Sequence, residues 1–92
     1  MIQSFKDDHT ADLFREGKSR RWASTASVAE RKLDLIHAAA VLNDLRVPPG
    51  NRLDALAGDR KGQDCIKIND QYRVCFVWRE DGAHEVEITD YH

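Results

Sequence analysis

Three side chains that can exchange protons end this chain: Asp90, Tyr91 and His92. A histidine titrates near neutral pH, and a phenol can donate or accept a hydrogen bond. Cleavage of RNA through its own 2′-hydroxyl requires a base, an acid for the leaving 5′-oxygen and positive charge on the phosphate. We expect Tyr91 and His92 to supply the base and the acid, in either assignment, with Asp90 orienting a neighbour. The alternative is a solvated tail with no chemical role.

Three cations could supply the charge on the phosphate: Arg60, Lys67 and Arg73. Clustered cations repel one another and are best tolerated where an anion binds. Phosphate matches the bidentate geometry of arginine. The alternative is a surface salt bridge from Arg73 to Glu87 or Asp64, worth less than ~1 kcal/mol.

A hydrophobic period of two from Cys65 onward predicts the sheet that positions these groups. Asn69-Asp70 and Asp81-Gly82 are turn signals that divide the run into three antiparallel strands. Alternation then predicts an apolar face and a polar face that nothing else in the chain covers. The apolar face consists of Ile66, Ile68, Val74, Phe76, Val86 and Ile88. The polar face consists of Lys67, Arg73, Cys75, Thr89 and Tyr91.

Helical signals fill the first half of the chain. Thr10 is expected to cap a short helix that Gly17 ends. Ser27-Val28-Ala29-Glu30 fits a capping box for a second helix that ends near Asn43. Met1–Phe5 alternates weakly and is expected to form an edge strand. The predicted fold is therefore α+β, with an N-terminal strand and two helices packed on a small antiparallel sheet.

Composition predicts one globular domain over residues 1–92, with 41% hydrophobic and 33% charged residues. The net charge of −2 excludes a uniformly basic nucleic-acid binder, but residues 46–80 carry seven Lys or Arg against five acids. Cys65 and Cys75 lack a CxxC spacing and are expected to be free thiols in the cytoplasm. No signal peptide, membrane span, metal-ligand spacing or nucleotide-binding glycine motif is present, so we expect no cofactor.

Several motifs together resemble the HigB toxins of the RelE/ParE toxin–antitoxin superfamily. They are Leu56-Ala57-Gly58-Asp59-Arg60-Lys61-Gly62, Asn69-Asp70-Gln71-Tyr72-Arg73 and the ending Asp90-Tyr91-His92. Pro48-Pro49-Gly50-Asn51-Arg52-Leu53 and the opening Met1-Ile2-Gln3-Ser4-Phe5 extend the resemblance over nearly the whole chain.

The resemblance implies a ribosome-dependent mRNA endoribonuclease that cuts in the ribosomal A site without a metal and inhibits translation. It also implies a HigA-like helix-turn-helix antitoxin as partner. Asp90, Tyr91 and His92 match the catalytic ending of the family, and Arg73 matches a basic position on its sheet. Arg60 lies in the Gly-Asp-Arg motif, and Arg52 and Lys61 are further candidates for binding RNA phosphates.

One departure motivates a different interpretation. Ala57 stands where relatives often have lysine, and the loss of this cation predicts weaker phosphate binding. The alternative is a non-catalytic or weakened toxin-like module that binds an antitoxin and serves in operon autoregulation. A gyrase-directed toxin, as in the ParE branch, is a third possibility. The terminal acid–base pair argues against it.

Overall fold

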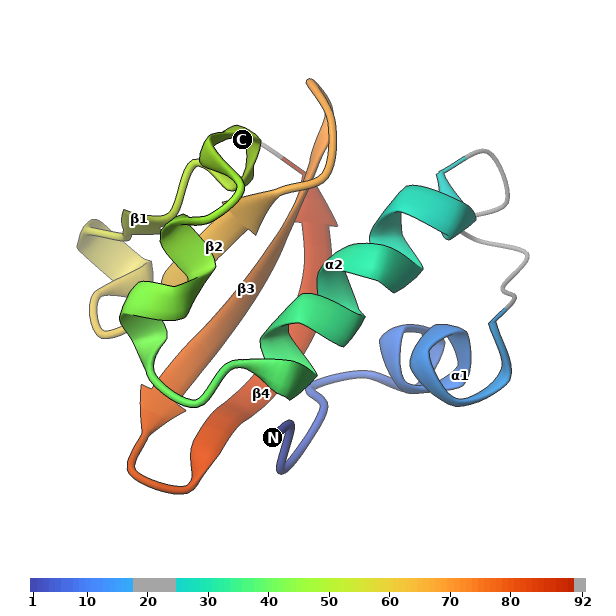
Figure 1. Ribbon diagram of the computed structural model, residues 1–92, viewed down its shortest axis with the longest axis horizontal. Helices are drawn as coiled ribbons and strands as arrows, with labels where there is room; N and C mark the ends of the chain where they lie inside the picture. Colours follow the sequence, from blue (N-terminus) through green and yellow to red (C-terminus); the bar gives the residue numbers. More distant parts are fainter. Residues whose placement is uncertain (18–24, 91–92) are drawn as a thin grey trace.

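The computed structural model describes residues 1–17 and 25–90 and has two layers (Figure 1). Helices α1 (Asp8–Glu16) and α2 (Ala26–Ala38) cover one face of a four-stranded antiparallel sheet. The strands β1 (Asp54–Ala55), β2 (Asp64–Lys67), β3 (Tyr72–Arg79) and β4 (Gly82–Asp90) follow one another in spatial order. Two 3₁₀ turns, η1 (Leu42–Arg46) and η2 (Pro49–Asn51), connect α2 to β1, and a third, η3 (Gly58–Arg60), connects β1 to β2. The predicted α+β class is confirmed.

The apolar face of the sheet forms the core with the helices. All six residues predicted for this face are buried, at 0–7% exposure: Ile66, Ile68, Val74, Phe76, Val86 and Ile88. Helix α2 packs on β3 and β4, and α1 packs on α2 and β4. Burial of a large aliphatic side chain contributes about 1.5–3 kcal/mol, so this face contributes most to holding the two layers together.

The helix boundaries differ from those predicted. Asp7 caps α1, because its carboxylate accepts the Thr10 N–H at 2.7 Å, whereas the Thr10 side chain is buried. Gly17 ends α1 as predicted, with a left-handed φ of 73°. Helix α2 already begins at Ala26, so Ser27 lies inside its first turn. Ala26 packs against the core, and such packing can outweigh the ~1 kcal/mol of a cap.

The end of α2 also comes earlier than Asn43. Ala39 is extended, and η1 then starts a new turn. The Asp44 carboxylate accepts the backbone N–H groups of Ala40 at 2.9 Å and Val41 at 3.2 Å. These bonds satisfy the donors that a longer helix would have used, and the break allows Leu45 to reach the core at 1% exposure.

The N-terminal segment pairs with the edge of β4, but only through two isolated parallel bridges, Ile2 with Ala83 and Phe5 with Val86. The predicted edge strand is therefore reduced to bridges. The short strand β1 was not predicted, because two residues are too few to show a period. Strands β2, β3 and β4 and their two turns are confirmed; the side chain of Asn69 stabilises the first turn by accepting the Gln71 and Tyr72 N–H groups.

No helix among the described residues is both long and apolar enough to cross a membrane.

Candidate functional site

Two rows of side chains form the polar face of the sheet. Register places Lys67 opposite Arg73, and Arg73 opposite Thr89. One row along, Asp54, Cys65, Cys75 and Glu87 face one another across the four strands. Because directly opposed side chains lie on one face about 4.5–5.5 Å apart at Cβ, Lys67 and Arg73 form a paired cationic position. The structure therefore brings together two of the predicted phosphate ligands.

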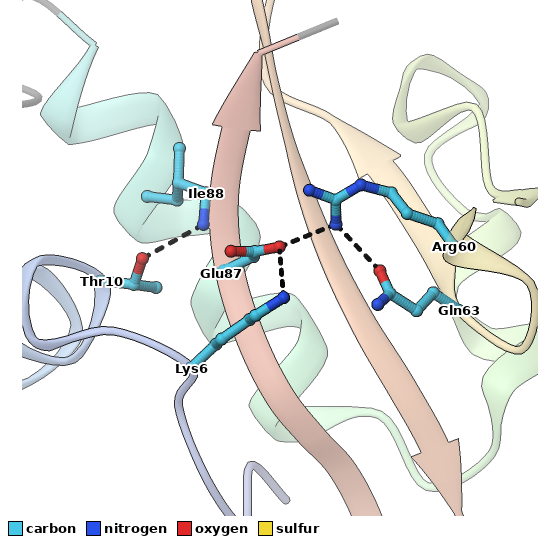
Figure 2. A network of polar contacts seen from close by, with 6 residues as sticks. All are labelled: Lys6, Thr10, Arg60, Gln63, Glu87 and Ile88. Atoms are coloured by element: carbon cyan, nitrogen blue, oxygen red, sulfur yellow. Dashed lines mark hydrogen bonds and ion pairs between the residues drawn. The ribbon is translucent and has the colours of Figure 1, made fainter. Parts of the chain in front are cut away.

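Arg60 reaches the polar face from η3 rather than from a strand. Its Nη1 atom lies 2.7 Å from Oε1 of Glu87 and 3.1 Å from Oε1 of Gln63 (Figure 2). The Lys6 Nζ atom approaches the same Glu87 oxygen at 3.7 Å. The hydrogen bond to Glu87 raises the pKa of Arg60, so this guanidinium is fixed as a cation. Sequence reasoning missed Glu87 as the centre of this network, although its parity with Thr89 placed it on the polar face.

The prediction that nothing covers the polar face is wrong. Cys65 and Cys75 are buried, at 3% and 1% exposure, although they lie on that face. On the same face, the Arg60 side chain extends from η3 to Glu87 on β4 and also binds Gln63 (Figure 2). A hydrogen bond from the Leu56 N–H to the Gln63 carbonyl, at 2.9 Å, closes the base of this loop.

The two cysteines are free and close together, as the prediction of free thiols required. The Cys65 thiol donates a hydrogen bond to the Cys75 sulfur, which raises the pKa of Cys65 and lowers the pKa of Cys75 to about 7. The positive charges of Arg73 and Arg60 also lower the pKa of Cys75, and burial opposes them. The two thiols therefore form a polarised pair within electrostatic reach of Arg60 and Arg73.

The remaining predicted residues are more dispersed. Asp90 lies opposite Tyr72, so by strand alternation it is on the other face from Arg73. There it lines a polar cavity of about 290 Å³ with Asp7, His9 and Tyr72. Lys67 is paired with Asp70 at 3.1 Å. Arg52 and Lys61 are exposed and follow η2 and η3, outside the strand rows. Tyr91 and His92 lie outside the described residues.

A fold comparison places this architecture in a known class. The structure is similar to the crystal structure of a YafQ variant from E. coli, with a TM-score of 0.61 and 12% sequence identity. The match covers 99% of this chain and 92% of the other. The chain therefore has the RelE-like fold, in agreement with the expected architecture.

Sequence comparisons then identify the family within this class. The model of the HigB-like toxins, described as RelE-like toxins of type II toxin–antitoxin systems, matches residues 3–92. Toxin HigB-1 of Vibrio cholerae is 39% identical over 80 residues, which are 85% of this chain and 84% of the relative. An uncharacterized protein of Haemophilus influenzae is 32% identical over 86 residues, 91% of this chain and 85% of the relative. This chain belongs to the HigB-like toxin family.

Proposed function

We propose that this toxin is a ribosome-dependent endoribonuclease that cleaves mRNA in the ribosomal A site and thereby inhibits translation in the cytoplasm. The observation that carries the proposal is the opposed Lys67–Arg73 position, two cations side by side on the polar face. An RNA phosphate bound there would receive charge from both, and bidentate contact from the arginine. RelE-like toxins are generally endoribonucleases, which supports the same assignment.

The proposed reaction is acid–base catalysis without a metal ion. Tyr91 or His92 removes the proton of the 2′-hydroxyl, and the other gives a proton to the leaving 5′-oxygen. Arg73 stabilises the charge that develops on the phosphate, where a correctly placed cation has the largest effect. Lys67, Lys61 and Arg52 hold neighbouring phosphates, and Asp90 orients one of the two terminal residues.

Arg60 has a more limited role in this proposal than the sequence suggested. Its Nη1 atom is held by Glu87 and Gln63, so binding a phosphate through that atom requires exchange of partners. With Ala57 in place of a cation, this arrangement favours a toxin of reduced phosphate affinity. The weakened, antitoxin-binding module is therefore the second candidate. A HigA-like helix-turn-helix antitoxin is the proposed partner in either case.

The experiment compares growth arrest and mRNA ends after induction of wild-type and variant chains. Tyr91→Ala, removal of His92 and Arg73→Ala should each reduce cleavage by about 100-fold or more, the usual contribution of an acid–base or charge-stabilising group. Arg79→Ala is the matched control: Arg79 is an exposed cation on the same strand, roughly 20 Å away. Purified protein should cut mRNA on ribosomes and leave naked mRNA intact.

Three outcomes separate the candidates. Unchanged arrest in all three site variants would refute the assigned residues. Arrest without new mRNA 5′ ends would refute the ribonuclease. Absence of arrest in the wild type, with retained binding to the product of a neighbouring helix-turn-helix gene, would establish the antitoxin-binding module.

A further inference from the structure

The backbone brings Cys65 and Cys75 within the distance of a disulfide. The Ile68 N–H donates to the Tyr72 carbonyl at 3.0 Å, which makes these two residues a hydrogen-bonded pair. Hydrogen-bonded and non-hydrogen-bonded pairs alternate along antiparallel strands. Three positions along the same register, Cys65 and Cys75 are therefore a non-hydrogen-bonded pair. Such pairs lie about 4.5 Å apart at Cα, inside the ~4.4–6.8 Å range of disulfides.

The positions and pKa values of the Cys65 and Cys75 thiols also favour a reaction between them. Cys65 and Cys75 are directly opposed in the register, so their side chains lie on one face of the sheet, and a hydrogen bond between them raises the pKa of Cys65 and lowers the pKa of Cys75. The same hydrogen bond, together with Arg73 and Arg60, lowers the pKa of Cys75 to about 7. A thiolate rather than a thiol is the nucleophile in thiol oxidation, and neighbouring guanidinium groups favour it. Cys75 is accordingly the attacking sulfur, and Cys65 the sulfur that resolves the intermediate.

The cysteines are buried, and a charge that acts on Cys75 from outside the strands is that of the partly exposed Arg60. Arg60 and Gln63 extend from the loop around η3, and the Arg60 side chain is 32% exposed. Its Nη1 atom is held by the contacts to Glu87 and Gln63 at 2.7 and 3.1 Å (Figure 2). Neighbouring residues of the loop, Asp59 and Lys61, are exposed. Opening of one side chain is a much smaller event than unfolding, so a small oxidant can reach the sulfurs in the native protein.

We propose that Cys65 and Cys75 form an oxidative modification site, at which a hydroperoxide closes an intramolecular disulfide across β2 and β3, near Arg60. The Cys75 thiolate attacks one peroxide oxygen, an S–O bond forms and the O–O bond breaks. For hydrogen peroxide, the departing hydroxide takes a proton and becomes water. The Cys65 sulfur then attacks the sulfenic sulfur, and its proton leaves with the hydroxyl group as a second water. Two thiols are oxidised and one peroxide is reduced.

This site is independent of the ribonuclease proposal, and its test needs no RNA. The folded, purified protein is treated with hydrogen peroxide and measured by intact mass and thiol titration after denaturation. We expect a monomer that has lost two hydrogen atoms and both titratable thiols, and that dithiothreitol restores. Cys65→Ala and Cys75→Ala should each prevent this product. Thiols that stay free until the protein is denatured, or disulfide-linked dimers as the main product, would overturn the proposal.

A matched pair of substitutions tests whether Arg60 covers the two thiols. Glu87→Gln weakens the contact that holds Arg60, whereas Asp70→Asn weakens the Lys67–Asp70 pair at 3.1 Å on the hairpin turn. We expect roughly fivefold faster disulfide formation in Glu87→Gln, and the wild-type rate in Asp70→Asn. Circular dichroism first verifies that both variants are folded. Equal rates in all three proteins would refute the covering role of Arg60.

Discussion

The two faces of the sheet are stabilised by different kinds of interaction. The apolar face is a continuous set of hydrophobic side chains packed under α1 and α2, and its stability does not depend on any one specific pair of atoms. The polar face depends on individual contacts, such as the 2.7 Å ion pair between Arg60 and Glu87, which are 27 residues apart. Burial is non-directional and follows from period alone, whereas an ion pair requires two particular atoms to meet. Substitutions should therefore have larger and more uniform effects on the first face than on the second.

The largest expected difference in stability is between substitutions of two neighbouring residues, Phe76 and Cys75, that lie on opposite faces of the sheet. Phe76→Ala should reduce the free energy of unfolding by about 3–5 kcal/mol, because Phe76 is fully buried and packs edge-to-face on Trp78. Cys75→Ala, one residue earlier and on the polar face, should cost roughly 1 kcal/mol. Urea unfolding followed by circular dichroism gives both values. Similar losses for the two variants would contradict the proposed difference between the faces.

A middle-sized effect is expected at Thr10, where α1 meets the edge of β4. The buried Thr10 hydroxyl accepts the Ile88 N–H at 3.1 Å, and so satisfies a donor on the outer edge of β4 where no strand of the described residues pairs with it (Figure 2). Thr10→Val keeps the shape but removes the acceptor, and should cost about 1–3 kcal/mol. Hydrogen exchange at Ile88 should become faster in this variant.

Thr10→Ser serves as the control for this contact. Serine keeps the hydroxyl, so the Ile88 amide should still exchange slowly. The free energy of unfolding should fall only by the contribution of one buried methyl group. If the serine and valine variants lose the same protection, then the hydroxyl does not stabilise this edge, and α1 is held by packing alone.

The sheet and Thr10 differ in how well the sequence alone predicts them. The apolar face, and the pairing of Lys67 with Arg73, could be predicted because both follow from alternation and from the Asn69-Asp70 turn that sets the register. Asp90 was predicted together with Arg73 among the catalytic residues, whereas the register places it with Ile88 on the opposite face. The role of Thr10 could not be predicted, because a threonine near a helix start is more often a cap than a buried acceptor.

The contact of Arg60 with Glu87 was also beyond sequence reasoning. Residues in strands can be paired by counting along the antiparallel register. Arg60 instead lies in η3, a short turn whose path depends on tertiary contacts with Glu87 and Gln63. The helix boundaries failed for a related reason: the capping preferences are worth ~1 kcal/mol, and packing of Ala26 and Leu45 competes with them.

The smallest predicted effect concerns Asp64, the exception on the apolar side. Register places it opposite both Ala55 and Phe76, and it lines a cavity of about 280 Å³ with Leu42 and Leu53. Burial, and then the charge of Asp54, raises the pKa of Asp64 above its ordinary 3.8. A raised pKa means that the folded protein binds this proton more tightly than the unfolded chain does. The carboxylate is therefore destabilising at neutral pH.

Asp64→Asn should consequently stabilise the protein at pH 7, by up to about 1 kcal/mol, because the amide keeps the shape and carries no charge. The sign follows from the linkage: as pH falls through the raised pKa, the wild-type residue becomes neutral in the folded state, so the advantage of the variant shrinks. Below the ordinary pKa of 3.8 the residue is protonated in both states, and the two proteins should unfold at the same temperature.

Thermal unfolding from pH 3 to pH 7 measures this convergence, with Asp59→Asn in the exposed η3 turn as the control. An advantage that is constant with pH would mean that asparagine stabilises by its contacts rather than by removing a charge. In that case the apolar face would tolerate a carboxylate as readily as the polar one does.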